Sequence, residues 1–162
     1  MLADMLTPVR AYSLLCPPDS PGFLLESVEG GERLARYSFI GYQPGPLDIG
    51  DGDPLPALRS VAAESTVPGI PRFHGGAVGY LGYETARRFE RLPLAAGPPP
   101  PMPEAAFLRA EDLAVFDHVT RRLRLLTIHR PDREDYGDAV ARIDEMERRL
   151  ASDGAPSREA GV

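Results

Sequence analysis

The sequence lacks the features of disulfide-bonded, secreted, membrane-spanning and nucleic-acid-binding proteins. Its single cysteine, Cys16, excludes an internal disulfide and an all-cysteine metal site, and it suits a reducing compartment. No run of about 18 apolar residues occurs, and residues 1–15 contain no apolar signal core, so we expect a cytoplasmic protein. The formal net charge is −6, whereas nucleic-acid binding requires clustered positive charge. We therefore expect neither membrane nor nucleic acid as a partner.

Signals for metal, nucleotide and catalytic sites are also missing. His74, His118 and His129 lie far apart, with no cysteine or histidine at metal-ligand spacing. The glycines at 75, 76, 79 and 82 lack both the Gly-x-Gly-x-x-Gly spacing and the Lys-Ser/Thr ending of phosphate-binding loops, which favours a packing role. Asp117 and His118 are adjacent on a predicted strand and should point apart, so they are not expected to form a catalytic dyad. We therefore predict no catalytic residue, metal or cofactor in this chain.

What the sequence does contain is the composition of a folded domain. Its 162 residues are 43% hydrophobic, which is ordinary, and are enough for one compact core. We predict a single domain over residues 1–150. Residues 151–162 have little apolar content and are predicted to form a flexible tail or the start of an interdomain linker.

Local patterns predict several strands and two helices. Segments rich in β-branched and aromatic residues, or with alternating residues, predict strands at 9–15, 23–28, 37–42, 47–49, 112–118 and 123–129. Apolar residues at helical spacing predict helices at 54–64 and 132–150. The segment 73–90 is expected to be a strand that turns into a short helix, its glycines allowing close backbone approach, and the proline-rich segment 93–103 a surface connector.

The order of these elements indicates the fold class. The 23–28 and 37–42 strands flank a Gly-Gly turn, and the 112–118 and 123–129 strands flank a polar turn, so both pairs predict hairpins. No repeating β-α-β unit separates them. The pattern therefore predicts an α+β fold with a mainly antiparallel sheet.

One segment, FLLESVEGGERLARYSFIG over residues 23–41, resembles a known family. Its Leu-Leu-Glu-Ser strand followed by Arg-Tyr-Ser-Phe-Ile-Gly is similar to the amino-terminal domain of anthranilate synthase component I. Further landmarks follow in family order between about residues 7 and 150: Thr7-Pro8-Val9, the glycine-rich run 75–83, Glu90 with Leu92-Pro93, and Val115-Phe116-Asp117-His118. The resemblance implies a single-domain α+β sandwich of antiparallel strands with outer helices.

The resemblance also implies a regulatory site for L-tryptophan. The family's feedback motif corresponds to Leu25, Glu26 and Ser27, with Arg36, Tyr37 and Ser38 on the following strand as second-rank candidates. Such a ligand needs an anionic acceptor, polar donors and an apolar slot. We expect Glu26 to meet the ammonium, Ser27 to hydrogen-bond, and Leu25 or Phe23 to line the indole pocket. Because adjacent strand residues point to opposite faces, a bulge or a backbone contact must bring Glu26 and Ser27 to one ligand.

By the same resemblance, the chemistry belongs to a part of the protein that this chain lacks. In the family a larger carboxy-terminal domain binds chorismate and Mg²⁺, and a glutamine amidotransferase subunit supplies ammonia for the synthesis of anthranilate. Nothing after residue 150 resembles the start of that domain, so we expect this chain alone to be inactive. The expected partners are L-tryptophan, the chorismate-binding catalytic domain and the glutamine amidotransferase subunit.

Two alternatives stay open at this point. In the first, the chain is a docking module that has no tryptophan sensing; in the second, it is the equivalent domain of aminodeoxychorismate synthase component I, an enzyme of the folate pathway. The complete Leu-Leu-Glu-Ser and Arg-Tyr-Ser-Phe-Ile-Gly pattern favours the anthranilate branch.

Overall fold

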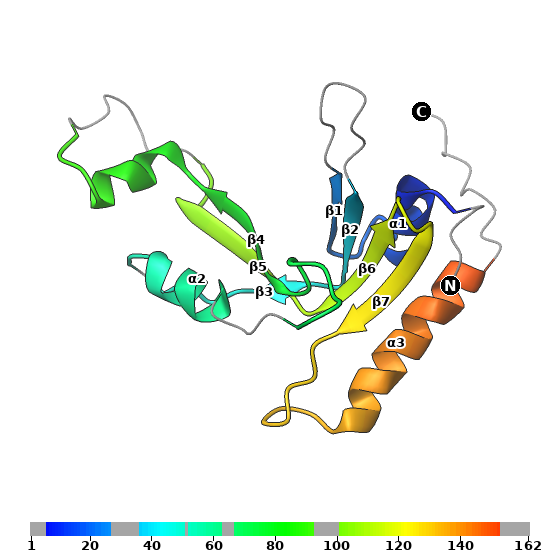
Figure 1. Cartoon of the computed structure of the whole chain (residues 1–162). Coiled ribbons are helices and arrows are strands. Elements are labelled where there is room, and N and C mark those ends of the chain that lie inside the picture. The colour runs from blue at the N-terminus through cyan, green and yellow to red at the C-terminus, as the bar shows by residue number, and fades with distance from the viewer. Residues whose placement is uncertain (1–5, 27–35, 51, 63–66, 93–100, 153–162) are drawn as a thin grey trace. The chain divides into compact units, whose positions relative to one another are not determined.

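The structure is a computed structural model that describes residues 6–26, 36–50, 52–62, 67–92 and 101–152 (Figure 1). The chain divides into two compact units. The first comprises Met1–Pro44 with Glu111–Val162, and the second comprises Gly45–Ala110.

The first unit contains a four-stranded antiparallel sheet covered on one face by two helices. The strand order is β1 (Gly22–Glu26), β2 (Tyr37–Tyr42), β6 (Asp112–Asp117) and β7 (Arg122–Thr127). Helix α1 (Pro8–Leu15) packs on β1 and β2, and helix α3 (Tyr136–Ala151) lies along β7 and contacts α1 (Figure 1). The core between helices and sheet is formed by buried side chains, among them Leu15, Ile40, Phe116, Leu123 and Met146.

The predicted strand at 9–15 is wrong, because this segment forms helix α1. Thr7 caps the helix: its side chain accepts a hydrogen bond from the Arg10 amide at 3.2 Å. Pro8 occupies the first turn, where its missing N–H is not needed. Ala11 and Leu15 lie one turn apart and are both 0% exposed. Burial at this helical spacing therefore outweighs the apparent alternation in the sequence.

The second unit contains a smaller antiparallel sheet in the order β3 (Gly45–Pro46), β5 (Ala105–Ala110) and β4 (Gly76–Leu81). Helix α2 (Leu55–Ala62) packs on β4, and the 3₁₀-helix η1 (Tyr83–Arg88) follows β4. Strand β5 was not predicted. The strand predicted at 47–49 is also wrong, since the paired residues are Gly45 and Pro46; Leu47 adds a hydrogen bond from its amide to the Phe107 carbonyl at 2.8 Å.

The predicted fold class and strand pairings agree with the structure. The α+β class, the antiparallel sheets, the pairing of β1 with β2 and the hairpin of β6 with β7 are confirmed. Helix α3 begins at Tyr136, not at 132, because Asp135 is its N-cap and its amide donates to the Asp138 carboxylate at 3.1 Å. The domain limits at 150 and 151, and the packing of the sheets as a sandwich, stay predictions. Within the described residues, no helix is long and apolar enough to cross a bilayer.

Candidate functional site

Four of the five residues predicted to bind tryptophan lie where β1 ends and β2 begins. Leu25 and Glu26 are the last residues of β1, Tyr37 is the first residue of β2, and Arg36 precedes it. Ser27 lies outside the described residues. The antiparallel pairing of the two strands therefore brings four of the five predicted residues to one end of the sheet.

Strand geometry places these side chains on two faces of the sheet. Glu26 is paired with Ser38, and Leu25 is paired with Phe39. Neighbouring residues of a strand point to opposite faces, so the Glu26 carboxylate shares a face with Ser38 while Leu25 shares the other with Phe39. The structure thus brings Glu26 and Leu25 close along the chain but not onto a common face.

The carboxylate of Glu26 ends a chain of hydrogen bonds that was not predicted from the sequence. Ser38 is 2% exposed, and its Oγ donates to Glu26 Oε1 at 3.4 Å. The same Oγ lies 2.7 Å from His118 Nε2, so a Ser38 that donates to Glu26 accepts a hydrogen bond from the His118 ring. Hydrogen bonds are therefore donated by His118 to Ser38 and by Ser38 to Glu26. In the structure Phe116 is paired with Ser38, and His118 lies two residues after Phe116. This register cannot be read from the sequence, so the sequence held no signal for the contact between His118 and Ser38.

Arg36 is held by a buried carboxylate. Asp117 is 2% exposed and accepts hydrogen bonds from Arg36 Nε at 3.4 Å and Nη2 at 3.1 Å. The amides of Val119 and Thr120 also donate to Asp117, at 3.1 and 3.2 Å. Burial acts to raise the pKa of Asp117, but the hydrogen bonds from Arg36 and Thr120 outweigh it and lower that pKa to about 2. The Arg36 guanidinium lies 4.9 Å from the centre of the Tyr37 ring, a cation–π contact.

Asp117 and His118 therefore serve different neighbours, as their adjacency on a strand predicts. Asp117 binds Arg36, whereas His118 contacts Ser38. Among the described residues, no group of three or more His, Cys, Asp or Glu side chains is placed to hold a metal ion. The arrangement near β1 offers charged and hydrogen-bonding groups to a polar or charged ligand.

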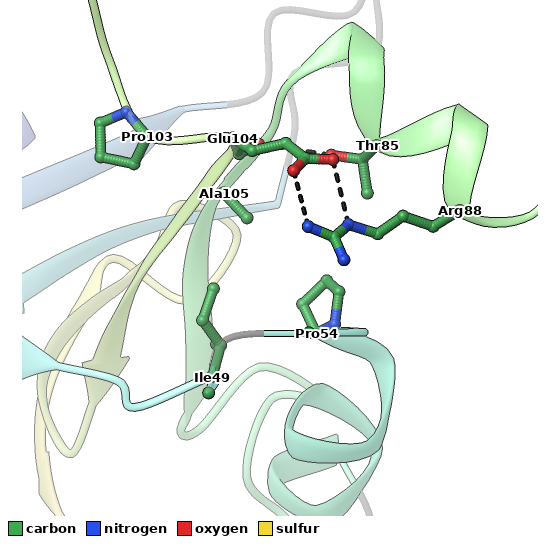
Figure 2. Close-up of a pocket in the computed structure, with 9 residues that line it drawn as sticks. Ile49, Pro54, Thr85, Arg88, Pro103, Glu104 and Ala105 are labelled. Carbon is green, nitrogen blue, oxygen red and sulfur yellow. Dashed lines mark hydrogen bonds and ion pairs between the residues drawn. The ribbon is translucent and has the colours of Figure 1, made fainter.

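A second candidate site, not predicted from the sequence, is a cavity of about 360 Å³ in the second unit (Figure 2). Its polar wall is an ion pair between Arg88, at the end of η1, and Glu104, just before β5. Ile49 and Pro54 are on the opposite side (Figure 2). Ile49 and Pro54 lie more than thirty positions before Arg88 in the sequence, so only the tertiary structure brings the two sides of the cavity together.

Comparisons with known proteins identify the fold first. A crystal structure of anthranilate synthase component I from Streptococcus pneumoniae matches with a TM-score of 0.65 over 96% of this chain and 37% of that chain, at 23% identity. This match shows a shared fold. No family model matches the chain.

Sequence relatives point to the same proteins. Anthranilate synthase component 1 from Streptomyces coelicolor is 59% identical over 162 residues, which are 99% of this chain and 32% of that protein. The protein of the same name from Thermus thermophilus is 38% identical over 99% of this chain and 37% of its own length. A probable anthranilate synthase component 1 from Schizosaccharomyces pombe is 39% identical over 97% of this chain and 34% of its own length. The chain is thus similar over nearly its whole length to anthranilate synthase component 1 proteins, and it spans about a third of the length of the curated relatives it matches.

Proposed function

We propose that the chain is the amino-terminal regulatory domain of an anthranilate synthase component I and binds L-tryptophan as a feedback inhibitor. The observation that carries this proposal is the 59% identity with the Streptomyces coelicolor protein along nearly the whole chain, which corresponds to 32% of that protein. Such a share suits one domain of a larger enzyme. The relatives' name supports a place in the synthesis of anthranilate.

The end of β1 has the chemistry that a zwitterionic aromatic ligand needs. Glu26 is exposed, and Ser38 orients its carboxylate toward a position where it can accept hydrogen bonds from an ammonium group. The Arg36 side chain is 54% exposed, and Leu25 is 40% exposed. Because β1 is the edge strand of its sheet, a ligand at this edge can reach side chains on both faces. In this proposal Ser27 and Tyr37 complete the site.

The reaction itself is assigned to the rest of the enzyme. We propose that this domain packs on a chorismate-binding catalytic domain, which holds Mg²⁺ and forms anthranilate with ammonia from a glutamine amidotransferase subunit. The chain alone then has no activity. Binding of tryptophan changes the turnover of chorismate through a coupling free energy of typically ~1–3 kcal/mol between the two sites. We place the protein in the cytoplasm, where its single cysteine stays reduced.

Fluorescence titration tests the sensing role directly. The chain contains no tryptophan, so the indole emission of added L-tryptophan reports binding without background from protein indoles. We expect saturable binding that Glu26→Gln weakens at least about tenfold, since the substitution removes the charge that faces the ammonium. Glu147→Gln, at an exposed position of α3, is the matched control and should bind as the unmodified chain does. A flat titration, both alone and with the catalytic domain added, would leave only the docking role.

The hydrogen-bond chain behind Glu26 gives a second test. Ser38→Ala removes the hydroxyl that orients the carboxylate and should weaken L-tryptophan binding severalfold, whereas Ser38→Thr keeps a hydroxyl and should restore it. Equal binding by Ser38→Ala and the unmodified chain would remove Ser38 from the proposed site.

A further inference from the structure

The cavity of the second unit has the size of a small-molecule site. Its volume of about 360 Å³ lies in the range of roughly 300–1,000 Å³ that is usual for such sites. Apolar side chains and a few polar groups line it: Ile49, Gly50, Gly52, Pro54, Thr85, Arg88, Pro103, Glu104 and Ala105. The charged pair can orient a polar ligand group, and Ile49, Pro54 and Ala105 offer apolar contacts beside it.

Its polar wall is held in place by the main chain. The Glu104 carbonyl accepts hydrogen bonds from the Gly82 amide at 2.6 Å and from Thr85 Oγ1 at 3.3 Å. A Cβ atom at Gly82 would lie 2.9 Å from this carbonyl oxygen, so glycine permits the close approach. Thr85 itself is only 3% exposed. Glu104 and η1 are therefore fixed relative to each other before any ligand arrives.

The Arg88 guanidinium keeps donors for a ligand. Its Nε donates to Glu104 Oε1 at 3.1 Å and its Nη2 to Oε2 at 2.7 Å, which uses two of five N–H donors. The third nitrogen points from the ion pair toward Pro54 across the cavity (Figure 2). The two side chains are 39% and 38% exposed, and exposed ion pairs contribute little to stability, so this pair can adjust to a ligand at small cost.

We propose that this cavity binds an α-amino acid with an apolar side chain, with the ligand carboxylate on Arg88, its ammonium on Glu104, and its side chain against Ile49, Pro54 and Ala105. A zwitterion fits better than a simple carboxylate, because a lone anion on Arg88 would lie beside the Glu104 carboxylate, whereas an ammonium group can pair with it. The site shares no residue with the proposed tryptophan site at β1. The proposal for the cavity is therefore independent of the proposed tryptophan-sensing function.

Nuclear magnetic resonance of the ¹⁵N-labelled 162-residue chain tests the proposal, with L-phenylalanine as the probe. We expect saturable shifts of the Arg88 Nε–H signal and of the Thr85 and Ala105 amides, with a dissociation constant on the order of 1 mM for a ligand of this size. 3-Phenylpropionate lacks the ammonium and phenethylamine lacks the carboxylate, so each should bind at least about tenfold more weakly. Equal binding of 3-phenylpropionate and L-phenylalanine would overturn the amino-acid assignment.

Matched variants locate the binding. Arg88→Ala should abolish the shifts of Thr85 and Ala105, and Glu104→Gln should weaken them about tenfold. Arg87→Ala is the control, since Arg87 belongs to the same helix but pairs with Glu84 and does not line the cavity. Unchanged binding by both Arg88→Ala and Glu104→Gln, or an absence of shifts with L-phenylalanine, would refute the site. Glu26→Gln should leave these shifts unchanged, which separates this result from the test of the β1 site.

Discussion

Buried polar side chains of the first unit each have a defined partner, and this pairing decides what the neighbouring exposed groups can do. Ser38 and Asp117 are both 2% exposed, and a buried polar group without a hydrogen bond is costly. Ser38 meets this need through His118 and Glu26, and Asp117 does so through Arg36 and two main-chain amides. The buried Ser38 and Asp117 thereby orient the exposed side chains of Glu26 and Arg36.

The depressed pKa of Asp117 predicts a loss of stability in acid. Its folded-state pKa is about 2, below the ordinary value of 3.8, so its contribution is complete above about pH 4 and is lost as the pH falls toward 2. Asp117→Asn should lower the free energy of unfolding at pH 7 by ~2 kcal/mol, because the amide cannot pair with the Arg36 charge. Urea unfolding at stepped pH values measures this, and the variant should show the shallower decline between pH 4 and pH 2. Asp144→Asn, exposed on α3, should behave like the unmodified chain. Identical pH profiles of Asp117→Asn and the unmodified chain would contradict the assignment.

Gly79 on β4 predicts a steric effect of a single methyl group. An added Cβ would collide with the carbonyl oxygen of Ala106 and lie 2.6 Å from the Cα of Phe107, both main-chain atoms that cannot rotate away. Gly79→Ala should therefore destabilise the protein by ~1–3 kcal/mol, as overpacking does. Gly45→Ala is the control, because a Cβ there meets nothing within 4 Å. Thermal unfolding compares the two, and equal melting temperatures would show that β4 and β5 separate to accommodate the methyl group.

At the scale of elements, α3 and the segment that precedes it are tied to the sheet by a charged network around Arg142, in the middle of the helix. Its Nε donates to Asp112 Oδ1 at 3.0 Å, its Nη2 donates to Glu134 Oε1 at 3.0 Å, and Nη2 also reaches the Ile128 carbonyl at 3.3 Å. A second bond joins Nη1 to Glu134. Asp112 in turn accepts a hydrogen bond from Thr127 at 2.8 Å. One helix side chain thus connects the ends of β6 and β7.

Removing Arg142 should loosen this helix from the sheet. Arg142→Leu leaves Asp112, which is 9% exposed, without its cation, and should lower the free energy of unfolding by ~2–3 kcal/mol. The hydrogen bond from Arg142 is the largest cause that lowers the pKa of Glu134 to about 2, so the variant should also lose less stability between pH 4 and pH 2. Urea unfolding of Arg148→Leu, at a side chain that is 73% exposed, supplies the control and should show little change. A loss as small as that of the control would mean that α3 is held by its apolar face alone.

The elements that the sequence predicted wrongly have a common cause. Residues 9–15 fit a strand by alternation and a helix by the spacing of Ala11 and Leu15, and short apolar segments fit both patterns equally well. Strand β5 escaped prediction because its sequence, AAFLRA, begins with two alanines, which are poor strand formers, and follows a proline-rich segment. Its pairing with β4 over six residues stabilises the strand, although the local β propensity of its sequence is low.

For the whole molecule, the proposed sensing role predicts where a ligand adds stability. L-Tryptophan at a hundred times its dissociation constant should stabilise the folded chain by ~2.7 kcal/mol. If it binds at β1, hydrogen exchange followed by mass spectrometry should slow in β1, β2 and β6, whether or not the cavity of the second unit is also occupied. Slowing confined to β4, β5 and η1 would place the indole ligand in the cavity near Arg88 and refute the β1 site.

The motif and the register contribute different parts of the candidate site. Leu25, Glu26, Arg36 and Tyr37 were predicted from a continuous stretch of sequence, and the β1–β2 pairing does bring them to one end of the sheet. His118 and Asp117 are 80 and 81 positions from the partners they contact, Ser38 and Arg36. Nothing local to either segment encodes that approach.

The amino-acid sequence by itself determined the α+β class, the hairpins, the family resemblance and the segment that carries the proposed tryptophan site, because turns, propensities and motifs act over a few neighbouring residues. Only the tertiary structure decided that 9–15 is a helix, that Ser38 connects Glu26 to His118, and that Arg88 and Glu104 border a cavity. These features depend on strand register and on burial against distant elements, which are properties of the folded chain as a whole.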